Sequence, residues 1–211
     1  MRTYLFDFDG TLVDSMPAYA GAMKKVLDDH GISYGDDLVK TITPLGLKGT
    51  AEYFRKIGLD LPLKEIIGEM GRNLYYEYAY NIGLKEHVLA ALQALKDRGD
   101  RLNVLTAGPH ITLDACIKRL GIGELFENIW SCDDFQTTKT DPEIYRKAAE
   151  KLGCRPEEVL FLDDNLDADK TAKSAGMAVC GVYDDSSRDY EAQIRAATDH
   201  YIYNFRELLT L

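Results

Sequence analysis

The chain has 211 residues, and its 35 acidic against 25 basic side chains give a formal net charge of −10 at pH 7. An acidic surface argues against nucleic acid or an anionic membrane as partner. The length suits one good-sized domain, or a core with a small inserted one, and no stretch approaches the ~20 apolar residues of a membrane span.

Two further features indicate the cellular compartment. The N-terminus runs straight into an apolar strand pattern, so we expect no signal peptide. The four cysteines show neither metal-binding nor redox spacing, and we expect mostly buried thiols and a reducing, cytoplasmic location. They are Cys116, Cys132, Cys154 and Cys180.

The first predicted element is a buried strand over residues 4–8, followed by an acidic turn with Gly10. Asp7 and Asp9 are two positions apart, so on a strand they would share one face. Two carboxylates at the end of a buried strand are costly unless a cation or a proton lies between them. The stretch therefore indicates a metal site, an acid/base pair, or both.

A helical block follows. Apolar residues at helical spacing predict a helix over residues 16–30, with Ser15 as its N-cap. Further helices are expected over residues 36–41, 50–57 and 63–80, and no convincing strand pattern lies between Ser15 and Gly83.

From residue 85 strands and helices alternate. Strands are predicted over residues 101–105, 128–132, 159–162 and 178–182, with helices between them over residues 109–120, 141–152 and 167–175. This alternation predicts an α/β fold with right-handed crossovers and a parallel sheet covered on both faces. Such sheets bind ligands at the carboxyl ends of their strands.

Polar residues follow several of these strands. Thr106 can be a helix N-cap or a phosphate ligand, and Lys139 can be a solvated loop lysine or the counter-ion of a carboxylate. Asp163 and Asp164 end a buried strand, where an acidic pair suits a hard cation. Asp167 and Asp169 come slightly later, where acidic residues favour a helix N-terminus.

The motifs carry a family resemblance that covers nearly the whole chain. Asp7-Phe8-Asp9-Gly10-Thr11, Thr106, Lys139 and Asp163-Asp164 resemble, in order, the motifs of the haloacid dehalogenase superfamily, in its phosphatase-like branch with phosphoglycolate phosphatases and β-phosphoglucomutases. The resemblance implies a Rossmann-like parallel-sheet core, residues 1–14 and 83–211, with an inserted all-helical cap domain of the C1 type, residues 15–82.

The resemblance also implies a mechanism, a cofactor and site residues. Asp7 would be the nucleophile that forms an aspartyl-phosphate, and Asp9 the general acid and base. Thr106 and Lys139 would stabilise the transferring group. Gly10, Ala107 and Gly108 would contact phosphate, and Mg²⁺ would be held by Asp7, Asp9, Asp164 and Asp163. Of the last pair we favour Asp164 as the direct ligand, although the spacing to Asp167 would suit Asp163.

Residues of the predicted cap indicate the kind of substrate. Lys48, in Gly46-Leu47-Lys48-Gly49, and Arg72 resemble substrate-contacting positions of sugar-phosphate enzymes. Glu52 occupies a position where the mutases place an arginine, and a carboxylate there repels a second phosphate.

We therefore expect a Mg²⁺-dependent phosphoric monoester hydrolase that acts on a small phosphorylated metabolite, as a monomer or weak dimer. A β-phosphoglucomutase-like phosphotransferase and a non-catalytic protein that binds a phospho-ligand or a protein are the alternatives.

Overall fold

A computed structural model describes the backbone of residues 1–211 and every side chain except that of Pro44. The chain divides into two compact units, one formed by Met1–Asp14 with Gly83–Leu211 and the other by Ser15–Ile82. No helix of the described residues is both long and apolar enough to cross a membrane.

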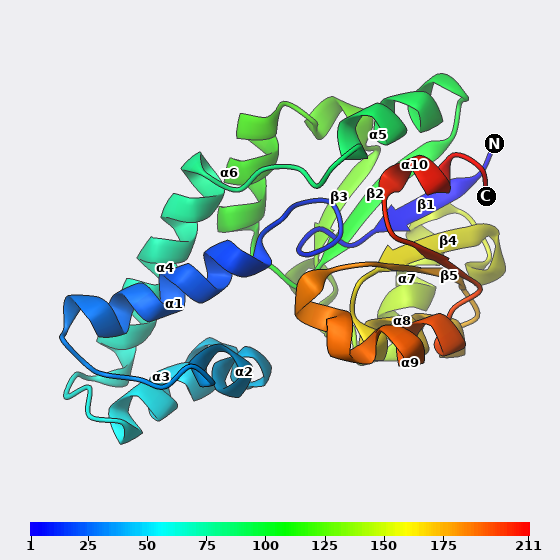
Figure 1. Cartoon of the computed structure of the whole chain (residues 1–211). Coiled ribbons are helices and arrows are strands. Elements are labelled where there is room, and N and C mark those ends of the chain that lie inside the picture. The colour runs from blue at the N-terminus through cyan, green and yellow to red at the C-terminus, as the bar shows by residue number, and fades with distance from the viewer. The chain divides into compact units, whose positions relative to one another are not determined.

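The first unit is built on a six-stranded parallel sheet in the order β3-β2-β1-β4-β5-β6 (Figure 1). The strands are β1 (Thr3–Phe6), β2 (Arg101–Thr106), β3 (Asn128–Ser131), β4 (Val159–Asp163), β5 (Ala178–Val182) and β6 (His200–Ile202). This arrangement confirms the predicted α/β class with a parallel, Rossmann-like sheet.

The strand register brings the predicted polar residues to one edge of the sheet. Phe6, the last residue of β1, pairs with Val104 on one side and Leu162 on the other. The amide N–H of Asp7 then donates to the carbonyl of Leu162 at 2.8 Å. Because the three strands are parallel, the residues that follow them emerge together at their carboxyl ends.

Helices cover both faces of this sheet. They are α5 (Val88–Asp97), α6 (His110–Leu120), α7 (Pro142–Leu152), α8 (Leu166–Ser174), α9 (Glu191–Ala197) and α10 (Phe205–Leu208). In Figure 1, α7 and α8 lie on one face of the sheet, and α5 and α10 on the other.

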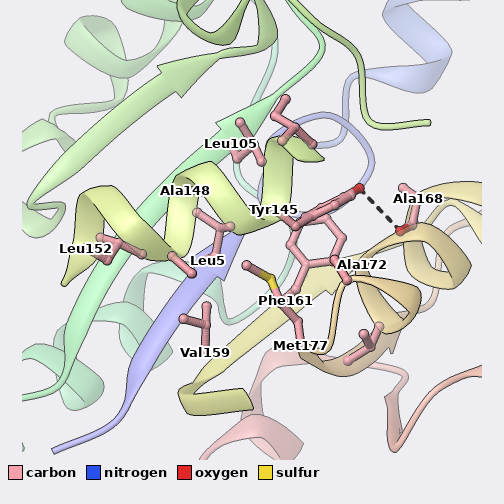
Figure 2. Close-up of a cluster of buried hydrophobic side chains, with 14 of the residues drawn as sticks. Leu5, Leu105, Tyr145, Ala148, Leu152, Val159, Phe161, Ala168, Ala172 and Met177 are labelled. Carbon is pink, nitrogen blue, oxygen red and sulfur yellow. Dashed lines mark hydrogen bonds between the residues drawn. The ribbon is translucent and has the colours of Figure 1, made fainter. Parts of the chain in front are cut away.

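Period-two alternation divides the sheet residues between the two apolar layers. Leu5 and Phe161 pack with Tyr145 of α7 in one layer (Figure 2). The phenol of Tyr145 donates a hydrogen bond to the carbonyl of Ala168 in α8 at 3.2 Å, which joins the two helices. On the opposite face Phe6 contacts the rings of Phe126 and Phe205.

The described residues of the second unit form helices joined by turns and irregular segments, without a strand. Its helices are α1 (Met16–Asp29), α2 (Leu38–Ile42), α3 (Gly46–Lys56) and α4 (Leu63–Tyr80), with a short 3-10 turn, η1 (Thr43–Leu45). Two local expectations were wrong. Residues 46–49 form the first turn of α3 instead of a loop, and the Ser15 hydroxyl, instead of capping α1, is buried with no hydrogen-bond partner among the described residues.

The chain leaves and re-enters the first unit through two paired segments. The amide of Asp14 donates to the carbonyl of Gly83 at 3.0 Å, and the amide of Lys85 donates to the carbonyl of Leu12 at 3.0 Å. Val13 and Leu84 form an antiparallel bridge between these bonds. The first unit therefore holds the two ends of the insertion side by side.

Candidate active site

The turn after β1 packs tightly against β4. Gly10 has φ +76°, a left-handed conformation that side chains rarely adopt, and a Cβ there would lie 2.7 Å from both carboxylate oxygens of Asp164. The next residue, Thr11, donates from Oγ1 to Oδ1 of Asp164 at 3.1 Å. Only glycine at position 10 lets the turn approach this carboxylate so closely.

Lys139 joins the ends of β1 and β4. Its ammonium donates to Oδ1 of Asp7 and, at 2.8 Å, to Oδ2 of Asp163. Burial alone would lower the pKa of Lys139, but the carboxylates of Asp163 and Asp7 outweigh burial and hold that pKa well above its ordinary value. Lys139 is therefore a fixed positive charge in this site, and the solvated-loop alternative is wrong.

The Asp7 carboxyl lies in a strongly acidic environment. Burial raises the pKa of Asp7 to about 8, and the charges of Asp163 and Asp9 act in the same direction while Lys139 opposes them. Without a further cation the site therefore retains protons at neutral pH. A nucleophilic carboxylate at this position needs additional positive charge beside it.

The two acidic residues at the end of β4 have different partners. Both oxygens of Asp163 accept hydrogen bonds, Oδ2 from Lys139 and Oδ1 from the amide of Asn165 at 2.8 Å. Asp164 accepts from Thr11, and burial together with the charges of Asp163 and Asp7 raises its pKa well above the ordinary value.

A further carboxyl group, which the sequence interpretation assigned only to a helix N-terminus, belongs to this environment. Asp169, in α8, is 0% exposed, and neither of its oxygens has a hydrogen-bond partner in the described part of the chain. Burial raises the pKa of Asp169 to about 10, and the charges of Asp163 and Asp164 add to the effect. Asp169 does lie in the first turn of α8, as expected, but its carboxyl group is buried, so burial decides its pKa.

These carboxyl groups fit a bound divalent cation. Oxygens of Asp7, Asp163 and Asp164 all lie within 4.8 Å of one another. Asp169 is a fourth buried carboxyl group whose pKa responds to the charges of Asp163 and Asp164, and Lys139 contacts only Asp7 and Asp163 among these groups. An all-oxygen donor set suits a hard cation such as Mg²⁺.

Asp9 is not part of the carboxylate group formed by Asp7, Asp163 and Asp164, although its charge acts on Asp7. Its Oδ2 accepts from the hydroxyl of Thr106 at 3.4 Å, and the Thr106 oxygen accepts from the amide of Gly108 at 3.0 Å. A Cβ at Gly108 would lie 3.2 Å from the Asp9 carboxylate, so the β2 turn packs closely on it. Asp7 and Asp9 thus have different partners: Asp7 lies among carboxylates and a lysine, and Asp9 lies beside a hydroxyl.

Lys48 and Arg72 belong to the helical unit, on α3 and α4, and both are exposed. Their assignment to substrate binding stays a prediction, as does the role of Ser15–Ile82 as a cap.

Comparisons with known proteins agree on one family. The haloacid dehalogenase-like hydrolase model matches residues 1–176. Pyrophosphatase PpaX of Bacillus velezensis is 30% identical over 84% of this chain and 81% of its own length. The phosphorylated carbohydrates phosphatase of Thermotoga maritima is 28% identical over 84% of this chain and 82% of its own length.

A solved structure shares the fold. CbbY from Rhodobacter sphaeroides, in complex with phosphate, has a TM-score of 0.81 at 24% identity, over 99% of this chain and 96% of the other.

Proposed function

The chain belongs to the haloacid dehalogenase-like hydrolases, and we propose that within this family it is a Mg²⁺-dependent phosphatase of a small phosphorylated metabolite. The observation that carries the proposal is the Asp7 carboxylate, which follows β1, contacts Lys139 and lies next to the carboxylates of Asp163 and Asp164. The names of the relatives support phosphate esters and anhydrides as the substrate class.

In the first step an oxygen of Asp7 attacks phosphorus in line with the leaving group, so an Asp7–phosphorus bond forms as the ester bond breaks. Asp9 gives its proton to the departing oxygen, which leaves as an alcohol. In the second step Asp9 takes a proton from water, and the resulting hydroxide displaces Asp7 from phosphorus. The products are inorganic phosphate and free Asp7.

Two side chains stabilise the charge on the transferring group. The Lys139 ammonium already contacts Asp7, so it lies beside the attacking oxygen. The Thr106 hydroxyl lies 3.4 Å from Asp9, where it can donate to a phosphoryl oxygen when substrate replaces that contact. Gly10, Ala107 and Gly108 would offer backbone contacts to the transferring phosphoryl group. The amide of Gly108 would first have to give up its hydrogen bond to the Thr106 oxygen.

Asp7 and Asp164 would hold Mg²⁺ directly, and the ion would supply positive charge to the phosphoryl oxygens. Asp163 would act beside them, because both of its oxygens already accept hydrogen bonds from Lys139 and from a backbone amide. The Asp9 carboxylate accepts a hydrogen bond from Thr106, so Asp9 would attract Mg²⁺ through its charge more than through a direct bond to the ion.

The helical unit Ser15–Ile82 would form a cap that selects the substrate. Lys48 and Arg72 would contact the part of the substrate that does not react. Glu52 is exposed on α3, where a carboxylate would repel a second phosphate. This feature favours hydrolysis of a monophosphate over a mutase reaction that passes through a bisphosphate.

The test is hydrolysis of p-nitrophenyl phosphate with Mg²⁺ and with EDTA, followed by a panel of sugar phosphates, phosphoglycolate and pyrophosphate. Asp7→Asn should abolish turnover at unchanged fold, whereas Asp14→Asn, the same charge change at a nearby exposed position, should leave it intact. Asp9→Asn should accumulate a phosphorylated Asp7, which mass spectrometry detects. A wild-type protein inactive on the whole panel would favour the non-catalytic alternative, and transfer to a second sugar without release of phosphate would favour the mutase.

A further inference from the structure

Lys85 makes an unusual set of contacts immediately after the chain re-enters the first unit. Its ammonium donates to the carbonyl of Gly10 at 2.6 Å, to the carbonyl of Tyr183 at 2.5 Å and to Oδ2 of Asp184 at 3.0 Å. An ammonium has three N–H donors, so all three are used. The Lys85 side chain is 19% exposed and that of Asp184 is 6% exposed, so these bonds are largely shielded from water.

These three acceptors come from two separate segments. Gly10 belongs to the turn after β1, whereas Tyr183 and Asp184 follow β5, on the far side of β4. The backbone amide of Lys85 also donates to Leu12 in the same turn. Lys85 therefore fastens residues 10–13 both to its own segment and to the end of β5.

The fastened turn lies directly on Asp164. Thr11 donates to this carboxylate, and Gly10 leaves no room for a methyl group against it. A displacement of the turn would consequently move Asp164 or break its hydrogen bond. Asp7, which precedes the turn, is held by a different cation, Lys139.

We propose that Lys85 is a positioning residue of the metal site, which fixes the Asp164 carboxylate by holding the turn at residues 10–13 against the end of β5. The inference rests on the proposed function only in taking Asp164 as a Mg²⁺ ligand. Loss of an outer partner of a metal ligand typically costs about 10- to 100-fold in metal affinity.

The charge of Lys85 must be separated from its positioning effect. Asp184 disfavours the ionised form of Asp164 and Lys85 favours it, so the two charges oppose each other at this carboxylate. If Lys85 alone were removed, the negative charge of Asp184 would lose its partner. The site would then attract Mg²⁺ more strongly, which would mask a loss of positioning. The double variant Lys85→Met/Asp184→Asn removes both charges together and leaves only the loss of the fastening.

The experiment measures Mg²⁺ binding to the substrate-free protein by isothermal titration calorimetry, with the Mg²⁺-induced rise in Tm as a second readout. The double variant should bind Mg²⁺ about tenfold or more weakly, and Lys85→Arg, which keeps charge and donors, should stay within roughly threefold of wild type. The matched control is Lys25→Met/Asp29→Asn, an exposed ion pair of 2.8 Å on α1, which should leave the Kd unchanged.

A folded double variant with the wild-type Kd for Mg²⁺ would overturn the inference, even if its Tm without metal were lower. If the double variant does not fold, Thr11→Val tests the same route, and an unchanged Kd there would overturn it equally. A wild-type protein that binds Mg²⁺ but hydrolyses no phosphate ester would refute the proposed function alone. A wild-type protein that binds no Mg²⁺ would refute both.

Discussion

The buried carboxyl group of Asp169 allows a prediction of unusual sign: its replacement by asparagine should stabilise the metal-free protein. Burial raises the pKa of Asp169 to about 10, whereas the unfolded chain has the ordinary value of 3.8. Between these two values the folded protein keeps a proton that the unfolded chain releases. The free energy of unfolding therefore falls as pH rises through this window.

The magnitude follows from that window. Each pH unit above 3.8 lowers the free energy of unfolding by about 1.4 kcal/mol, so the loss reaches about 4 kcal/mol at pH 7. An asparagine side chain at this position would not titrate but would bury an amide, at a cost of about 1–3 kcal/mol if it finds no partner. We expect Asp169→Asn to raise the free energy of unfolding by about 1–3 kcal/mol at pH 7 and to flatten its dependence on pH.

Urea unfolding in EDTA at pH values from about 5 to about 9 measures both effects. Asp167→Asn is the matched control, because Asp167 is exposed in the first turn of the same helix. That variant should lose less than about 1 kcal/mol through weaker interaction with the helix dipole. An Asp169→Asn protein that is less stable than wild type at pH 8, with an equally steep pH dependence, would refute the reasoning.

Three further predictions concern the site and the helical unit. Asp164→Ala should raise the Mg²⁺ concentration needed for half-maximal activity far more than Asp163→Ala, because Asp163 is already held by hydrogen bonds; the reverse ranking in a Mg²⁺ titration would make Asp163 the direct ligand. Gly10→Ala should destabilise the protein by at least about 1–2 kcal/mol, because the left-handed backbone at this position disfavours a side chain. The added methyl group would also collide with the Asp164 carboxylate, which adds to this cost. The control Gly21→Ala, in α1 with open space around it, should instead gain about 0.5–1 kcal/mol, and equal Tm values for the two variants would contradict this account. Lys48→Ala should raise KM more than it lowers kcat if the helical unit is a cap, and unchanged kinetics on every good substrate would exclude a substrate contact there.

Elements with strong periodicity could be predicted from the sequence. The apolar run of residues 178–182 is β5 as expected, and the helical spacing of residues 63–80 is α4. Strand β6 was missed because three residues, His200–Ile202, show no alternation; pairing with β5 forms it. The first turn of α3 was missed because Gly46 and Gly49 resemble loop residues, although only Gly46 has a positive φ.

The site residues likewise divide into those that the sequence could locate and those that it could not. Asp7, Lys139, Asp163 and Asp164 could be located because each lies near the end of a predicted strand or precedes a predicted helix, and parallel strands end at one edge. The first strand itself ends at Phe6, two residues before its predicted end. Asp169 could not, since helical spacing does not tell which polar residue of a short helix turns inward. Its position five residues after Asp164, among small residues, was the available signal. Lys85 left no local pattern, because its acceptors come from distant segments.

The paired exit and return of the chain bear on how the protein is made. Strand β1 is synthesised first, yet it pairs with β2 and β4, which emerge from the ribosome only after the whole of Ser15–Ile82. The helical insertion packs its first helix, α1, on its last helix, α4. Until β2 and β4 emerge, β1 must wait with its apolar residues uncovered. The bridge between Val13 and Leu84 joins the two ends of the insertion once both have been synthesised, and this shortens the loop that β1 must close to meet β2. The Val13–Leu84 bridge would in this way prepare the pairing of β1 with β2.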